Sequence, residues 1–155
     1  MGIDGPAGGE VDAGGLRIAI AQSTFNRTVT DGLRDGALAA LEEAGATDVT
    51  VVEVPGAFEL PLAAQRLAQA GYDAVVALGA VVMGDTDHYE HVAHRASEGL
   101  QRVMLDTGVP IAFGILTVRE AHQAATRSAP GRGNKGAEAA MAAVETVRAL
   151  RRIAP

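Results

Sequence analysis

Apolar residues follow one another without alternation from Ala74 to Val82, and no charged residue interrupts them. Such a run is typical of a central parallel strand covered on both faces, because a strand with one exposed face alternates apolar and polar positions. The pattern changes abruptly at 83–88, which reads MGDTDH. Asp87, with Glu90 three residues later, predicts the N-cap of a helix that begins just after this strand.

Further apolar segments predict the remaining elements of the chain. Short apolar runs bounded by polar turns predict strands at 16–21, 49–54 and 111–116. Apolar residues at three- and four-residue spacing predict helices between and after these strands. The expected helices span 29–44, 60–70, 89–105, 119–127 and 135–152.

The regular alternation of strands and helices predicts an α/β fold in three layers. We expect a flavodoxin-like, four-stranded parallel sheet with helices on both faces. In that strand order the first and third strands are neighbours, and ligands bind beyond the carboxyl ends of the strands. The polar loops at 22–27 and 83–88 should therefore face each other. Phe25 and His88 would then lie at opposite sides of one cavity.

Composition narrows the function classes. The 155 residues are 48% hydrophobic, which is enough for one folded domain, expected at 16–155. A Gly-rich, acidic segment without periodicity at 1–15 predicts a flexible tail. The net charge of -6 argues against a nucleic-acid or anionic-membrane surface.

Two absences in the sequence exclude further classes. The chain has no cysteine, so it has no disulfide, no catalytic thiolate and no zinc–thiolate site. No apolar run is long enough to span a bilayer, and the N-terminus lacks the pattern of a secretory signal. These features predict a cytoplasmic location.

Three residues in the predicted turns have a chemical and a structural interpretation each. Phe25 offers a ring face on which a flat heterocycle can stack, although a loop phenylalanine also folds back on a core. Glu59 can accept hydrogen bonds from substrate hydroxyls, or can complement a helix dipole. His88 is suited to proton transfer near neutral pH, whereas a histidine beside an N-cap is more often structural.

Three histidines raise the question of a metal site. His88, His91 and His94 recur at three-residue spacing, which turns about 60° per step around a helix. The outer two therefore lie too far apart around the helix for all three to bind one ion. A site of two histidines completed by a carboxylate is the remaining alternative. Surface pairs of His94 with Glu90 and Glu98 explain the same residues, so we expect no metal.

A Gly-rich basic loop at 131–136 is the remaining candidate. Arg127, Arg132 and Lys135 flank it and could clamp a phosphate, while a helix start with surface charge is the structural alternative. The glycine spacing does not match a P-loop. A phospho-acceptor domain is also disfavoured, because the first strand ends in 22–24 (QST) without an acidic pair.

Taken together, the motifs resemble those of the lumazine synthase (6,7-dimethyl-8-ribityllumazine synthase) family from Leu16 to Arg152. Each motif is weak alone, but chance does not account for all of them in this order and at these separations. The matching stretches are 23–26 (STFN), 54–61 (VPGAFELP), 72–79 (YDAVVALG), 84–90 (GDTDHYE), 113–117 (FGILT) and 133–140 (GNKGAEAA).

The resemblance implies a transferase of riboflavin biosynthesis. Such an enzyme condenses 5-amino-6-(D-ribitylamino)uracil with 3,4-dihydroxy-2-butanone 4-phosphate, releases phosphate and water, and needs neither a metal nor an organic cofactor. It further implies that His88 carries protons and Phe25 stacks on the pyrimidine. The implied substrate-binding residues of the same chain are Phe25, Ala57, Phe58, Glu59, Ala80, Val81, Val82, Asp85 and Thr86.

The resemblance also implies a shared site. Phe113, Arg127 and Lys135 would come from a neighbouring subunit, so the expected assembly is a homopentamer or a capsid of twelve pentamers. Riboflavin synthase is a candidate protein partner. Two alternatives remain at this stage: a non-catalytic paralogue that binds a flavin or lumazine, and a shell-forming scaffold.

Three positions depart from the family pattern. Met83 stands where the family usually has Arg, Asp85 where small residues are common, and Asp87 where the neighbour of the histidine is typically uncharged. Together they make the turn more acidic. We therefore expect weaker binding of the phosphate substrate than in close relatives.

Overall fold

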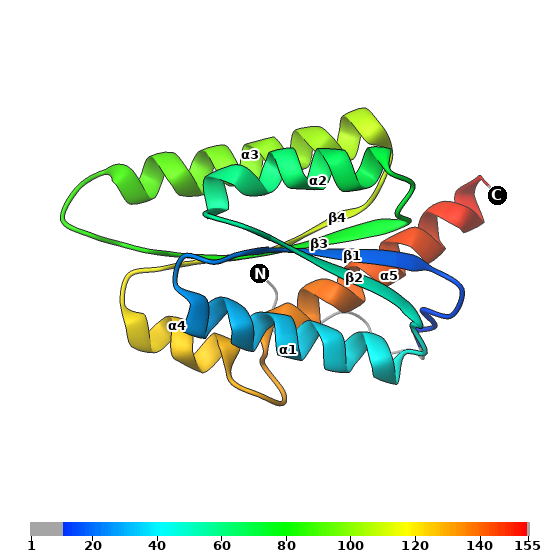
Figure 1. Ribbon diagram of the computed structural model, residues 1–155, viewed down its shortest axis with the longest axis horizontal. Helices are drawn as coiled ribbons and strands as arrows, with labels where there is room; N and C mark the ends of the chain where they lie inside the picture. The colour runs from blue at the N-terminus through cyan, green and yellow to red at the C-terminus, as the bar shows by residue number, and fades with distance from the viewer. Residues whose placement is uncertain (1–10, 155) are drawn as a thin grey trace.

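The computed structural model describes residues 11–154 and contains the predicted parallel sheet (Figure 1). The strand order is β2-β1-β3-β4, and every neighbouring pair is parallel. This order confirms the flavodoxin-like prediction, with β1 beside β3. The strands are β1 (Arg17–Ser23), β2 (Asp48–Val54), β3 (Ala74–Val82) and β4 (Ile111–Val118).

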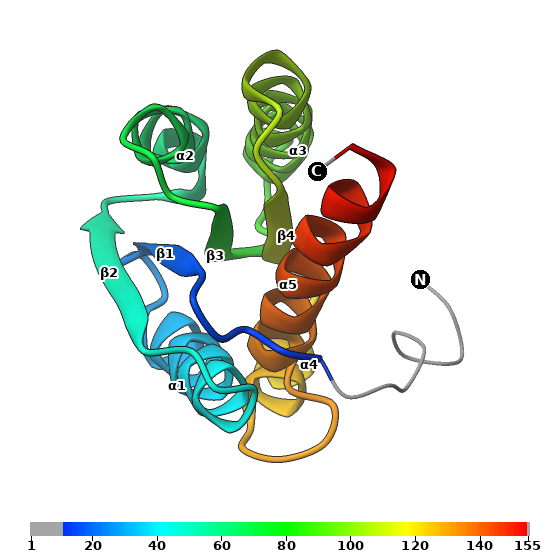
Figure 2. The same cartoon turned by 90° about the vertical axis from the view of Figure 1, so that its right-hand side faces the viewer.

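Helices cover both faces of the sheet, as the view in Figure 2 shows. One face carries α2 (Leu60–Gln69) and α3 (His88–Thr107), and the other carries α1, α4 and α5. A short 3-10 helix, η1, precedes α2. The remaining bounds are α1 (Arg27–Glu43), η1 (Ala57–Glu59), α4 (Ala121–Ser128) and α5 (Lys135–Ile153).

The central strand β3 is buried along almost its whole length, as its unbroken apolar run predicts. Val76 and Leu78 belong to the core beneath α1 and α5, whereas Val75 and Ala77 belong to the core beneath α2 and α3. Alternate residues of one strand thus complete two separate cores. This double burial explains why β3 shows no polar position until it ends.

The predicted N-cap of α3 is confirmed in its position, because the helix begins at His88, directly after Asp87. Asp87 occupies the N-cap position, but its side chain makes no capping hydrogen bond and its backbone (φ -76, ψ 5) is not extended. Its carboxylate lies 3.2 Å from Nε2 of His91 instead. Thr86 Oγ1 accepts a hydrogen bond from His88 N at 3.4 Å. The carboxylate of Asp87 thus pairs with the imidazole one turn ahead and does not bond to the free N–H groups of the first turn.

The predicted tail at 1–15 needs a partial correction. Residues 1–10 lie outside the described residues, but residues 11–15 pack against the domain. Ala13 is fully buried, and its N–H donates to Ala44 O at 2.9 Å. Arg148 donates to the carbonyl oxygens of Asp12 and Gly14, both at 2.9 Å. Arg148 lies near the other end of the sequence, so no local pattern reveals its contact with residues 12–14.

Among residues 11–154, no helix combines the length and the apolar character needed to cross a bilayer. The longest helix, α3, has 20 residues and carries charged side chains throughout. The apolar surface of each helix faces the sheet instead, which is the arrangement that positions the loops at the carboxyl edge.

Candidate active site

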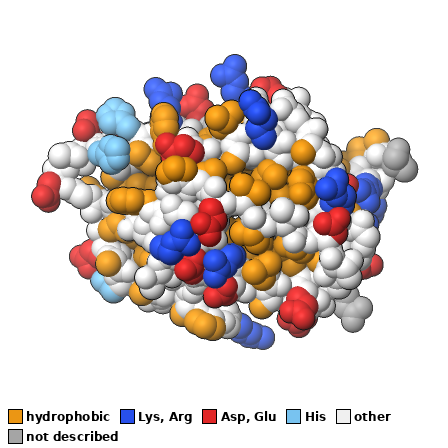
Figure 3. Space-filling view, viewed as in Figure 1, with side chains coloured by type: hydrophobic (Ala, Val, Ile, Leu, Met, Phe, Trp, Pro, Cys, Tyr) orange, Lys and Arg blue, Asp and Glu red, His pale blue; other side chains and the backbone are white. Residues whose placement is uncertain are grey.

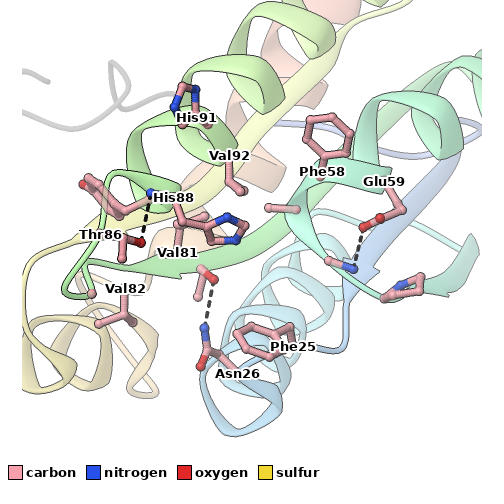
Figure 4. A pocket seen from close by; sticks show the side chains of 16 residues that line it. Phe25, Asn26, Phe58, Glu59, Val81, Val82, Thr86, His88, His91 and Val92 are labelled. Carbon is pink, nitrogen blue, oxygen red and sulfur yellow. Dashed lines mark hydrogen bonds between the residues drawn. The ribbon is translucent and has the colours of Figure 1, made fainter.

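A cavity of about 680 Å³ opens at the carboxyl ends of β1 and β3 (Figure 4). Its walls come from four segments: the β1–α1 loop, the turn from β2 to η1, the last residues of β3, and the first turns of α3. Phe25 and His88 both line it, as the strand order requires. The sheet topology therefore creates the cavity that the two polar loops were predicted to share.

The loop after β1 is fixed by hydrogen bonds to both neighbouring segments. Phe25 N donates to Pro55 O at 2.9 Å, and Asn26 Nδ2 donates to Ala80 O at 3.0 Å. Asn26 has a positive φ of 61°, a conformation that asparagine tolerates better than most residues. The ring of Phe25 is 73% exposed. It does not fold back on the core, so the structural alternative for this residue is wrong.

The turn that leads into η1 forms a second wall. Glu59 Oε2 accepts a hydrogen bond from Gly56 N at 3.0 Å, and Ala57 is buried beneath it. Glu59 thus stabilises its own turn while its carboxylate lines the cavity. Phe58 is 61% exposed on the same wall. Two exposed aromatic rings at one mouth are unusual for a surface that faces only water.

The end of β3 and the start of α3 complete the site. Ala80, Val81 and Val82 form an apolar floor, and Thr86 stands at one end of it. The imidazole of His88 points into the cavity, on the side of Phe25 (Figure 4). His88 is held by its place in the first turn of α3, where its backbone N–H bonds to Thr86.

Sequence reasoning missed three lining residues on α3. Tyr89, His91 and Val92 line the cavity together with His88. The three- and four-residue spacing of His91 and Val92 from His88 indicates that these residues share its side of the helix. Which side faces the cavity depends on the direction in which α3 leaves β3.

Four predicted residues do not line this cavity. Asp85 lies in the turn after β3 but outside the lining, and Phe113, Arg127 and Lys135 lie on β4, α4 and α5. Arg127 Nη1 donates to Gln123 O at 3.0 Å, and Lys135 Nζ lies 2.9 Å from Glu138 Oε2. Within the described residues, the lining contains no Lys or Arg at all.

The charged groups with perturbed pKa values lie outside the cavity. The hydrogen bond and the charge of Arg27 lower the pKa of Glu53, and Glu53 raises the pKa of Arg27 in the same way. Their atoms Nη2 and Oε2 are 3.0 Å apart. This exposed pair ties the start of α1 to β2, next to the loop that presents Phe25. Neither residue lines the cavity, so the pair supports the wall formed by the β1–α1 loop without placing a charge inside the cavity.

No group of three or more His, Asp and Glu side chains in residues 11–154 is arranged to hold a metal ion. The cavity instead combines apolar floor, exposed rings, one imidazole directed inward and one carboxylate. Such a set can hold a flat polar ring by stacking and can transfer protons to it.

The chain is similar to known proteins over a range that includes the whole cavity. The family described as 6,7-dimethyl-8-ribityllumazine synthase matches residues 15–151. A 6,7-dimethyl-8-ribityllumazine synthase from Kineococcus radiotolerans is 53% identical over 157 residues, which span 100% of this chain and 98% of the relative. Every residue that lines the cavity lies within the matched range.

Proposed function

The chain belongs to the 6,7-dimethyl-8-ribityllumazine synthase family, and we propose that the cavity beside Phe25 and His88 is its active site. The protein is a transferase of riboflavin biosynthesis that forms 6,7-dimethyl-8-ribityllumazine. It condenses 5-amino-6-(D-ribitylamino)uracil with 3,4-dihydroxy-2-butanone 4-phosphate and releases phosphate and water. The family resemblance predicted from the motifs is thereby confirmed.

The observation that supports this site best is the exposed ring of Phe25 above an apolar floor. A pyrimidine that stacks on this ring would lie over Val81, within reach of the backbone groups of Ala80 and Val82. Glu59 lies on the adjacent wall, where its carboxylate would accept hydrogen bonds from the ribityl hydroxyls. Ala57 and Phe58 would contact the same chain from the η1 turn.

His88 is the proposed proton carrier. Formation of the imine, elimination of phosphate and closure of the ring each move a proton between bound reactants, so orientation and one titratable group supply the chemistry. The imidazole is the only titratable side chain that Figure 4 shows directed into the middle of the described cavity. The backbone amides of Asp85 and Thr86 would hold the phosphate beside it, at the start of α3.

A second subunit is proposed to complete the site. Phe113 is 44% exposed on β4, whereas the exposed Val51 lies on β2, and these strands form opposite edges of the sheet. Hydrophobic side chains also gather on the face that carries β2 and α2 (Figure 3). Two different apolar edges on one chain favour a head-to-tail contact, and such contacts form a ring when the rotation from one subunit to the next closes.

In this ring, Phe113, Arg127 and Lys135 of one subunit would reach the cavity of the next. The neighbour would then supply the cation that the lining lacks. We propose the homopentamer as the smallest active unit, either alone or as twelve pentamers in a capsid. The cytoplasmic location and an association with riboflavin synthase stay predictions. No feature favours the paralogue or scaffold alternatives.

A turnover assay tests the proposed function. The purified assembly, given both substrates, is expected to form the fluorescent lumazine product. Addition of a metal chelator should leave the rate of product formation unchanged. Absence of product under these conditions would overturn the proposed activity. Phe25→Ala should raise the Michaelis constant for the pyrimidine substrate, while Phe25→Trp should preserve stacking and activity.

Mixed assemblies test the shared site. Phe25→Ala damages a subunit's own cavity, whereas Arg127→Ala damages the cavity of its neighbour. Subunits of the two variants, dissociated and reassembled together, should regain part of the activity that each homogeneous assembly lacks. If Arg127 served its own cavity, every cavity of the mixed assembly would carry one of the two lesions, and no activity would return. A variant with both changes in one chain, mixed with wild type, is the control that gives the fraction of active cavities expected for a shared site.

A further inference from the structure

The turn between β3 and α3 presents an electrostatic problem for the proposed function. The resemblance assigns the phosphate group to the amides of Asp85 and Thr86, yet the turn carries the carboxylates of Asp85 and Asp87 and no cation. None of the described residues that line the cavity is Lys or Arg. A phosphate bound here would lie close to like charges, which weakens its binding.

His91 lies where it can offset one of these charges. Its Nε2 atom is 3.2 Å from Asp87 Oδ2, and the two residues stand one helical turn apart. The imidazole donates a hydrogen bond to the carboxylate, and in its protonated form it also carries the opposite charge. His91 lines the cavity as well, so the pair lies at the rim next to the turn.

We propose that His91 is a specificity-determining residue that holds the Asp87 carboxylate in this contact, offsets its charge and thereby permits the turn to bind the phosphate of the substrate. This inference rests on the proposed function, because it takes the phosphate subsite from it. His91 acts through Asp87 and need not touch the substrate. The pair is therefore a local compensation for an acidic residue that this chain carries beside its proposed proton carrier.

Within the same chain, none of the charged groups near the pair takes over this role. Arg95, one turn further along α3, lies 3.2 Å from Glu98, and Glu59 across the cavity is bonded to Gly56 N. The side chains of His91 and Asp87 are 72% and 77% exposed. An exposed pair contributes modestly and is screened by salt, so the expected effect is a few-fold change that disappears at high ionic strength.

A double-mutant cycle tests the proposal. His91→Phe keeps a planar ring on the cavity wall but removes both nitrogens, and Asp87→Asn removes the charge. At low ionic strength, His91→Phe should raise the Michaelis constant for the phosphate substrate about two- to fivefold. The Michaelis constant for the pyrimidine and the turnover number should stay at their wild-type values. Adding Asp87→Asn to His91→Phe should restore the wild-type constant or lower it further.

His94→Phe is the matched control, since His94 lies on the same helix but does not line the cavity. It should leave both Michaelis constants unchanged. In calorimetric titration with inorganic phosphate, the assembled His91→Phe variant should bind more weakly than wild type. His94→Phe and the double variant should bind at least as tightly as wild type. This second measurement reports on the subsite without requiring turnover.

Two results would overturn the inference. One is an unchanged phosphate affinity in His91→Phe; the other is a loss in His91→Phe that persists in the double variant, which would make His91 a direct ligand or a purely structural residue. The proposed function would fail differently, through absence of product with the wild-type assembly. Normal wild-type turnover without the expected cycle would therefore refute the charge compensation alone.

Discussion

His88 combines an exposed, inward-directed ring with a backbone fixed by the first turn of α3. Its neighbours on that turn serve other contacts: Asp87 pairs with His91, and Thr86 accepts the His88 N–H. The proposed catalytic role therefore depends on the side chain alone. A substitution of the ring should change the chemistry without loosening the turn.

We expect His88→Ala to lower the turnover number roughly 10²- to 10⁴-fold, because an oriented general acid or base contributes about this factor. The Michaelis constants should change much less, and steady-state formation of lumazine measures both. His94→Ala, on the same helix and outside the cavity lining, should remain near wild type. Near-full activity of His88→Ala would show that the histidine is structural.

Met83 provides a second prediction for a single residue. Its side chain is 46% exposed, and its neighbours Val82 and Gly84 both line the cavity. An arginine at this position would bring a cation to the phosphate subsite. Met83→Arg should lower the Michaelis constant for the phosphate substrate about three- to tenfold. Met83→Gln, which is similar in length but uncharged, should leave it nearly unchanged, and an unaltered constant in Met83→Arg would contradict the idea.

Asn134, the N-cap of α5, links the three helices that cover one face of the sheet. Its side-chain Oδ1 accepts from the N–H groups of Gly136 and Ala137 at 2.9 and 3.0 Å. Its Nδ2 donates to the carbonyl oxygens of Gly32 in α1 and of Ser128, the last residue of α4, at 3.0 and 3.1 Å. Asn134 is buried, so one side chain satisfies polar groups from three helices.

Asn134→Ala should therefore destabilise the protein by about 2–4 kcal/mol, since it removes a cap and leaves buried carbonyl groups unpaired. Urea unfolding at equal protein concentration measures this difference. Thr146→Ala is a suitable control, because Thr146 Oγ1 bonds only within its own exposed helix turn, to Ala142 O. An equal loss in both variants would argue against a linking role for Asn134.

At the scale of the whole molecule, the exposed aromatic groups divide between two separate surfaces. Phe25 and Phe58 stand at the cavity mouth, and Phe113 lies on the edge strand β4. In the proposed ring, a contact between these surfaces would join successive subunits head to tail and would bury all three rings. The isolated chain would leave both surfaces exposed to water.

Light scattering should therefore give a particle mass near five or sixty times the 15.8 kDa of the chain. Phe113→Asp, which places a charge on the β4 surface, should shift the mass toward smaller species and lower activity with it. His94→Asp adds the same charge away from this edge and should preserve the assembly. A wild-type mass equal to one chain would refute the shared site.

Much of the fold was predictable because its signals are local. The unbroken apolar run of β3 predicts its uniform burial, and the spacing of Leu33, Ala37 and Leu41 predicts the buried face of α1. The site was less predictable. The motifs indicated Phe25, Glu59 and His88 and placed Asp87 at the N-cap of a helix. They did not indicate that the carboxylate of Asp87 pairs with His91, because the helix geometry brings these two side chains together.

The sequence by itself determined the order of elements, the parallel sheet and the family, because periodicity and short motifs depend on residues that are close in the chain. The tertiary structure decided which of those residues meet. It brought Asn26 to Ala80 and Arg148 to Asp12, and it separated Phe113 from the cavity of its own chain. Such contacts depend on how helices leave the sheet and pack on it, and no pattern along the chain specifies that direction.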